Sequence, residues 1–296
     1  MAFAIETRGL TKHYGKTRGI VEVDLAVNEG EVFGFLGPNG AGKSTTIRLL
    51  LDLIRPTEGT ATVLGMDSQA DSVEVNRRVG FLPGDVRLYD TMTGREMLTL
   101  FGHLRGMTDW PHARAVAERF ELDLDIKVGS YSSGNYQKLG LVQAFMHQPD
   151  LLILDEPTSA LDPLVQQEFY RLVDETKAEG KTVFLSSHVL PEVERIADRV
   201  GIIRDGRLIV VEEVEALKAR ALRRMEIQFA APVPDGSFDG LPSVREARYH
   251  DNSVELMIEG PVDAVVKAAA GYEVHNVVSH EADLEEIFLE MYRGEI

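Results

Sequence analysis

Gly37-Pro38-Asn39-Gly40-Ala41-Gly42-Lys43-Ser44 is the stretch of this sequence that decides the fold. It matches the pattern G-x-x-x-x-G-K-[S/T], in which glycines let backbone amides approach phosphate groups closely. In such a loop the lysine reaches the terminal phosphates and the serine hydroxyl ligates magnesium. The octet, together with Thr45 directly after it, therefore predicts a binding site for a nucleoside triphosphate.

The segments on either side of the loop decide between this interpretation and a glycine-rich turn that matches by chance. A phosphate-binding loop needs a strand before it and a helix after it, so that its amides and the positive end of the helix converge on the phosphates. Residues 32–36 form a wholly apolar run, which is typical of a strand buried on both faces. Ile47, Leu50, Leu51 and Ile54 recur at helical spacing. The flanks therefore favour the phosphate site.

Length and composition indicate an ordinary globular protein. The 296 residues leave room for one large domain and a smaller one, and 44% of them are hydrophobic. No apolar stretch approaches the ~18 to 20 residues that span a bilayer, and the start lacks the pattern of a secretory signal. The sequence has no cysteine, which excludes disulfides and thiolate metal sites. A cytoplasmic location is expected.

The formal charge of −17 speaks against a nucleic-acid partner. Proteins that bind nucleic acids usually present a basic face to the phosphate backbone. No nucleic-acid partner is therefore expected.

The order of the apolar segments predicts an α/β fold. Residues 21–27 alternate between apolar and polar, which predicts a half-exposed antiparallel strand. Thr93 and Glu96 form a capping box ahead of a helical run, so that a helical subdomain is predicted over about residues 90–150. Short apolar runs with helical segments between them indicate a parallel sheet covered on both faces. These runs are residues 151–154, 182–185 and 200–203.

The pattern changes near residue 212, which divides the chain into predicted domains 1–212 and 213–296. The second part alternates strand candidates with helix candidates and predicts a small C-terminal α/β domain. The strand candidates are residues 225–229, 254–258 and 274–278, and the helix candidates are residues 262–270 and 284–292.

Asp155 and Glu156 end the apolar run that begins at Leu151. A buried strand would deliver Asp155 to the magnesium ion beside Ser44, directly or through water. Glu156 would then polarise the attacking water, a role worth about 10²–10⁴ in rate. The alternative is an acidic pair that only ends a strand, and the upstream phosphate loop disfavours it.

Tyr131-Ser132-Ser133-Gly134-Asn135 precedes a helical stretch and offers a second phosphate-binding geometry. One polypeptide cannot easily bring this turn to its own phosphate loop. At this point the sequence resembles the ATPase subunits of ABC transporters, whose signature turn completes the ATP site of the opposite subunit. The loop, the signature, the paired acids, Ser159-Ala160-Leu161-Asp162 and Ser187-His188 occur in the family's order. The resemblance covers about residues 1–212.

The resemblance implies a P-loop NTPase core with an antiparallel β subdomain and a helical signature subdomain. It implies that Tyr14 stacks on adenine, although a tyrosine before a glycine is also common as a packed strand residue. It implies that Ser132 and Gly134 hold the γ-phosphate bound to the partner subunit. His188 is similar to the switch histidine that contacts the γ-phosphate, and with Lys43 and Glu156 it completes the expected catalytic set.

Asp162 has two compatible interpretations. The resemblance implies that it lines the dimer seam, and Asp162-Pro163 also predicts a helix N-cap with proline in the first turn.

The chain departs from the family after the strand-like run 79–82. The family usually places Gln or Glu next to Pro83, where this chain has Gly84 followed by Asp85. We hypothesise that Asp85 replaces the missing residue at the magnesium ion or the attacking water. The alternative is a turn aspartate. Tyr136 also stands where many members have another polar residue.

The C-terminal part resembles daunorubicin-resistance-type exporter ATPases, with a closing helix at residues 283–290. The resemblance implies a subunit that hydrolyses ATP with Mg²⁺ as a head-to-tail homodimer. It would drive drugs or other hydrophobic compounds through separate transmembrane permease subunits, docked near residues 84–105 at the inner face of the membrane. The alternative is a soluble ATPase that acts on ribosomes or nucleic acid without a membrane partner.

Overall fold

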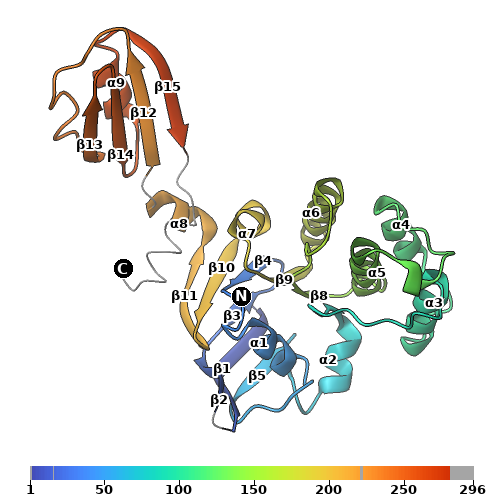
Figure 1. Cartoon of the computed structure of the whole chain (residues 1–296). Coiled ribbons are helices and arrows are strands. Elements are labelled where there is room, and N and C mark those ends of the chain that lie inside the picture. The colour runs from blue at the N-terminus through green and yellow to red at the C-terminus, as the bar shows by residue number, and fades with distance from the viewer. Residues whose placement is uncertain (1, 16, 221–222, 281–296) are drawn as a thin grey trace. The chain divides into compact units, whose positions relative to one another are not determined.

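The computed structural model describes residues 2–15, 17–220 and 223–280, which pack into two compact units (Figure 1). The first unit is Met1–Val211 and the second is Glu212–Ile296. Both combine helices with strands, which agrees with the predicted α/β class.

A central sheet organises the first unit, with the strand order β11-β10-β4-β9-β8-β7. From β10 to β7 all neighbouring strands are parallel. Every residue of β4, β8 and β9 is buried, and β4 and β8 are accordingly almost wholly apolar, while β9 ends in two buried serines. The strands are β4 (Val32–Leu36), β7 (Val79–Leu82), β8 (Leu151–Asp155), β9 (Thr182–Ser187), β10 (Arg199–Arg204) and β11 (Arg207–Glu213).

Helices cover both faces of this sheet. In Figure 1, α1 lies below the sheet, and α6 and α7 lie above it. Helix α1 contacts β8, while α6 and α7 contact β9. The cross-strand neighbours Phe33 of β4 and Phe184 of β9 stack with their ring centroids 5.8 Å apart. The helices are α1 (Lys43–Leu50), α6 (Pro163–Ala178) and α7 (Leu190–Ile196).

A second, antiparallel sheet has the order β2-β1-β5-β6, with β3 also paired to β1. The prediction of one strand over residues 21–27 is wrong, because the structure divides this segment into β2 and β3. The break lies at residues 24 and 25, where the Asp24 carboxylate accepts a hydrogen bond from the Gly9 amide at 2.6 Å. The strands are β1 (Phe3–Tyr14), β2 (Thr17–Val23), β3 (Ala26–Asn28), β5 (Glu58–Val63) and β6 (Met66–Asp67).

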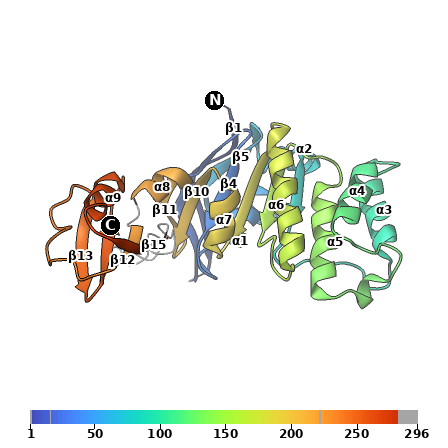
Figure 2. The same cartoon turned by 90° about the horizontal axis from the view of Figure 1, so that it is seen from above.

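A group of helices follows β7 in the chain and lies beside that end of the sheet (Figure 2). Helix α5 contacts α3, α4 and β7. The capping box at Thr93 is confirmed, since the Glu96 amide donates to Thr93 Oγ1 and the Thr93 amide donates to the Glu96 carboxylate. The elements that follow β7 are α3 (Gly94–Leu104), α4 (Pro111–Arg119), η1 (Val128–Ser130) and α5 (Ser133–Phe145), while α2 (Ser72–Arg78) directly precedes it.

The second unit contains an antiparallel sheet with the order β13-β14-β12-β15. Its core joins alternate residues of β12 and β14 to Phe238 and to Val265 of α9. Strand β13 was not predicted, because its sequence VREARYH is mostly polar. The predicted closing helix lies outside the described residues. The elements are α8 (Val214–Arg220), β12 (Arg223–Phe229), β13 (Val244–His250), β14 (Ser253–Ile258), α9 (Asp263–Ala269) and β15 (Val274–His280).

No helix in the described part of the chain combines the length and the apolar character that a bilayer span requires.

One partly buried histidine of the first unit, His147, makes the free energy of unfolding depend on pH. Burial and the nearby charge of Arg105 lower the pKa of His147 to about 4, against about 6.5 in an unfolded chain. Below about pH 6.5 the unfolded state takes up a proton that the folded state does not. The free energy of unfolding therefore decreases as the pH falls from about 6.5 towards about 4.

We predict that His147→Gln weakens this acid sensitivity. The measurement is the free energy of unfolding in urea at pH 7 and pH 5, compared between wild type and variant. His103→Gln, at an exposed histidine of α3, is the control and should keep the wild-type difference. An equal loss of stability in wild type and His147→Gln would contradict the assignment.

Candidate functional site

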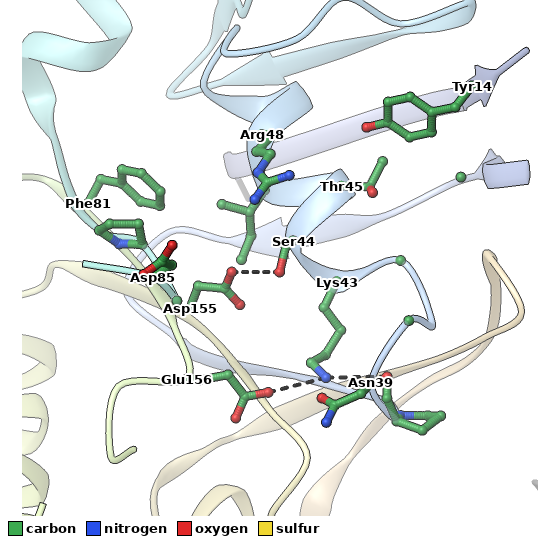
Figure 3. Close-up of a pocket in the computed structure, with 17 residues that line it drawn as sticks. Tyr14, Asn39, Lys43, Ser44, Thr45, Arg48, Phe81, Asp85, Asp155 and Glu156 are labelled. Carbon is green, nitrogen blue, oxygen red and sulfur yellow. Dashed lines mark hydrogen bonds and ion pairs between the residues drawn. The ribbon is translucent and has the colours of Figure 1, made fainter. Parts of the chain in front are cut away.

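A pocket of about 530 Å³ opens where the loop after β4 meets α1 (Figure 3). It gathers residues from β1, from the loop after β7 and from the end of β8. Gly37, Ala41, Ser132, Gly134 and His188 of the predicted site are not among its lining residues. The predicted residues that line it are Tyr14, Pro38, Asn39, Gly40, Gly42, Lys43, Ser44, Thr45, Asp85, Asp155 and Glu156.

The phosphate loop has its shape because two of its glycines admit no side chain. Gly42 has a φ of 117°, and a Cβ atom there would lie 2.6 Å from the Ile20 side chain. At Gly37 a Cβ atom would lie 2.4 Å from the backbone oxygen of Ile203. Gly42 caps α1 without any side-chain hydrogen bond. The first amides of α1 can therefore serve an anionic ligand.

Lys43, Glu156 and His188 form one chain of side-chain contacts. Lys43 is 6% exposed, and its Nζ donates to the Gly37 carbonyl oxygen at 2.6 Å. The same Nζ lies 3.2 Å from Glu156 Oε1, as Figure 3 shows. The other carboxylate oxygen of Glu156 lies 2.7 Å from Nδ1 of His188. The structure thus brings together the three residues that were predicted to be catalytic.

Ser44 and Asp155 meet on the other side of the pocket. Ser44 Oγ donates to Asp155 Oδ2 at 2.7 Å (Figure 3). A hydroxyl and a carboxylate are the hard oxygen donors that Mg²⁺ prefers. These two residues therefore fit a magnesium ion beside the phosphate loop, which would polarise the phosphate oxygens.

Ser186 is a residue of this site that was not predicted from the sequence. Its fully buried hydroxyl donates to Asp155 Oδ1, the carboxylate oxygen that Ser44 does not contact. Ser186 lies directly opposite Asp155 in the parallel pairing of β8 and β9. The register of these strands, which the sequence does not state, is the signal that identifies it.

The loop after β7 approaches Asp155 through Gly84. A Cβ atom at Gly84 would lie 3.1 Å from Asp155 Oδ2, so a side chain there would crowd the carboxylate. The carboxylate of Asp85 is 73% exposed and forms a salt bridge of 2.7 Å with Arg87. Asp85 lines the pocket, and its role at the magnesium ion stays a prediction.

Tyr14 lies at the end of β1 and is 44% exposed. Lys12 Nζ lies 5.5 Å from the centroid of its ring. The exposed ring lines the pocket, where an aromatic base could stack on it. The adenine contact of Tyr14 stays a prediction.

The signature turn opens a helix, as predicted, but it does not face the pocket of its own chain. Ser132 is the N-cap of α5, and its hydroxyl accepts a hydrogen bond from the Asn135 amide at 3.2 Å. Ser132 is exposed and Gly134 is half-buried. The structure therefore leaves the turn accessible to a ligand held by another molecule.

Asp162 is the N-cap of α6, which confirms one of its two interpretations. Its carboxylate accepts hydrogen bonds from the amides of Leu164 and Val165, both at 3.1 Å. Pro163 stands at the start of the helix. A position at a dimer seam stays a prediction.

Comparison with known proteins gives consistent results. The sequence profile of the ABC transporter family matches residues 20–159. A bacitracin transport ATP-binding protein of Bacillus licheniformis is 34% identical, with 99% of each chain covered. A daunorubicin resistance ATP-binding protein of Streptomyces coeruleorubidus is 33% identical, with 98% of this chain and 95% of the relative covered.

Solved structures show the same fold. A structure of an ATP-binding subunit of an ABC transporter is 29% identical with a TM-score of 0.67, covering 73% of this chain and 92% of that one. A dimeric ATP-binding cassette bound to ADP and Pi gives a TM-score of 0.64 at 23% identity, covering 71% of this chain and 98% of that one. The P-loop ATPase fold predicted from the sequence is therefore confirmed.

We predict that Ser186→Ala weakens the use of Mg²⁺ by this site. The change leaves one oxygen of the buried Asp155 carboxylate without its donor, and such outer contacts are worth about 10- to 100-fold in metal affinity. The Mg²⁺ concentration that gives half the maximal ATPase rate should rise about tenfold.

The matched control is Thr182→Val, which removes a hydroxyl of similar burial at the other end of β9, where it accepts a hydrogen bond from the Gly30 amide. This variant should keep the wild-type Mg²⁺ dependence. If both variants shift the dependence equally, Ser186 acts only through the stability of the strand.

Proposed function

This chain belongs to the ABC transporter family, and from this premise we propose that two copies close head to tail around two ATP molecules to drive export. It is an ATP-binding subunit that hydrolyses ATP, with Mg²⁺ as the usual partner ion. Subunits of this family act as dimers with separate membrane permeases. The proposal adds the arrangement of the dimer, the residues that act in it and the direction of transport.

The position of the signature turn is the observation that carries the head-to-tail arrangement. Ser132 and Gly134 stand at the start of α5, outside the pocket that Lys43 and Ser44 line. A two-fold axis would place the turn of each copy over the nucleotide of the other and make both sites equivalent. Each ATP would then contact a phosphate loop from one copy and a signature turn from its partner.

The chain of contacts from Lys43 through Glu156 to His188 supports a hydrolytic role for these three residues. Lys43 would bind the terminal phosphates as a point charge, and the amides of the loop would hold the remaining oxygens. Glu156 would accept a proton from the attacking water, since its carboxylate already lies beside Lys43 and His188. His188 would orient that carboxylate and contact the γ-phosphate. Ser44 and Asp155 would hold the magnesium ion.

The names of relatives point to the transported compounds. The similar proteins are named for bacitracin transport, daunorubicin resistance and, in Mycobacterium tuberculosis at 32% identity, fluoroquinolone export. We infer that this chain drives the export of drugs or other hydrophobic compounds from the inner face of the membrane. The net charge of −17 gives no support to the alternative function on ribosomes or nucleic acid.

We predict that Glu156→Gln traps the dimer. Loss of the general base should lower the steady rate of ATP hydrolysis by at least about 100-fold. The neutral amide also removes a negative charge close to the γ-phosphate, so that the ATP-bound dimer should accumulate. Sedimentation with Mg²⁺ and ATP measures the dimer, and release of phosphate measures the rate.

The control is Glu118→Gln on the exposed surface of α4, which should behave as wild type. The head-to-tail proposal predicts that adding Ser132→Ala to Glu156→Gln weakens the trapped dimer. A Glu156→Gln protein that stays monomeric with Mg²⁺ and ATP at high concentration would refute the arrangement.

A groove of about 710 Å³ between α2, α3 and α5 supports the docking of a permease near the predicted residues 84–105. Val73 and Leu104 line it, and each is 74% exposed, which is unusual for large apolar side chains. Arg105 lies beside them and donates to backbone carbonyl oxygens of residues 76, 77 and 79. We propose that a cytoplasmic helix of the permease inserts its apolar face here.

We predict that Leu104→Asp weakens copurification of the permease by at least tenfold, because the charge must be desolvated at the interface. The measurement is the amount of permease retained on tagged ATPase after detergent extraction. Val266→Asp, at a 54% exposed valine of α9, is the control and should retain the permease. Equal retention by Leu104→Asp and wild type would place the docking site elsewhere.

A further inference from the structure

Two consecutive residues in α5 connect this helix to both loops that border the nucleotide pocket. Gln137 is only 8% exposed. Its Nε2 donates to the backbone oxygen of Glu156 at 3.2 Å and to that of Pro157 at 3.0 Å. Both protons of one buried amide are therefore directed at the turn that carries the proposed general base.

Tyr136 makes the corresponding contact with the loop after β7. Its hydroxyl accepts a hydrogen bond from the Leu88 amide at 3.3 Å. The hydroxyl proton has two acceptors within reach, the Leu88 carbonyl oxygen at 3.2 Å and Asp90 Oδ1 at 3.0 Å. Burial and the contact with Asp90 raise the pKa of Tyr136, so the hydroxyl keeps its proton at neutral pH.

The turn that Gln137 holds needs outside support. Glu156 has a φ of 52°, a left-handed conformation that is unfavourable for a residue with a side chain. On one side the Glu156 amide donates to the Ser186 carbonyl oxygen at 3.1 Å. On the other side, Gln137 and the Ser159 amide donate to the Glu156 carbonyl oxygen. Gln137 is thus the contact by which a different subdomain fixes the backbone of Glu156.

We propose that Tyr136 and Gln137 form a two-armed link that makes the signature turn, the loop at residues 88–90 and the backbone of Glu156 move together. The inference rests on the proposed function, in which Ser132 at the start of the same helix contacts the nucleotide of the partner. A shift of α5 on that contact would move the Glu156 carbonyl through Gln137 and the loop after β7 through Tyr136. Both residues are positioning residues, because neither lines the pocket.

The first test is Gln137→Leu, which keeps the approximate size of the side chain and removes both donors. The link predicts a decrease in kcat for ATP hydrolysis of at least tenfold, with KM for ATP within twofold of wild type, because the phosphate loop is untouched. Gln137→Glu should lose more activity, since its carboxylate faces two carbonyl oxygens. The matched control is Thr176→Val, which removes a buried hydroxyl that donates to Leu172 within α6.

Thr176→Val should change Tm by about as much as Gln137→Leu does, and its kcat should stay within twofold of wild type. The inference is overturned if Gln137→Leu, with a Tm similar to that of the control, also has the kcat of the control. It is likewise overturned if the KM for ATP rises by the same factor by which kcat falls.

The second test is a double-mutant cycle with Tyr136→Phe, which removes only a hydroxyl. The single variant should lower kcat about threefold, and Tyr136→Phe combined with Gln137→Leu should be no slower than Gln137→Leu alone. If hydrolysis requires both loops to follow α5, the loss of the Gln137 arm already prevents the joint movement, so the further loss of the Tyr136 arm adds nothing. Losses that multiply would show two independent contacts and overturn the link.

These measurements separate the inference from the proposed function. The trapped dimer of Glu156→Gln reports on the head-to-tail arrangement, and the kcat of the link variants reports on α5. A monomeric Glu156→Gln protein together with an impaired Gln137→Leu would refute the arrangement and keep the link. A trapped Glu156→Gln dimer together with an unimpaired Gln137→Leu would support the head-to-tail arrangement and refute the link.

Discussion

The parallel pairing of β4, β9 and β8 is the constraint on which the site depends. Leu36 lies opposite Ser187, and Asp155 lies opposite Ser186, so the carboxyl ends of the three strands meet at one edge of the sheet. The phosphate loop follows the first of these strands, Glu156 follows the third, and His188 follows the second. A shift of one residue in this register would point Ser186 away from Asp155 and separate Glu156 from His188.

The features that could be predicted from the sequence are those with a local cause. The phosphate loop, the capping box at Thr93 and the cap at Asp162 each depend on residues a few positions apart, and the structure has all three. Ser186 and Gln137 could not be predicted, because their contacts depend on which strand or loop lies opposite. The prediction of one strand over residues 21–27 is wrong for the same reason, since the Asp24 carboxylate accepts a hydrogen bond from the Gly9 amide, which is distant in the sequence.

Gly84 and Tyr136, the two positions that depart from the family pattern, each have a specific neighbour in the structure. Gly84 stands where the backbone passes close to Asp155, in a space that leaves little room for a side chain. Tyr136 extends across to the loop that begins after Gly84 and contacts it at Leu88 and Asp90. The sequence showed both positions as exceptions, but only the three-dimensional arrangement shows that Tyr136 of α5 contacts the same loop in which Gly84 lies.

The contact between Lys43 and Glu156 has a consequence for the thermodynamics of nucleotide binding. An ammonium group that is 6% exposed would be costly to bury without a counter-ion. Glu156 supplies that counter-ion in this structure, and in the proposed mechanism a phosphate oxygen would take its place beside Lys43. Entry of the nucleotide would then exchange one anion for another, and it would free the carboxylate to meet the water molecule that Glu156 is proposed to activate.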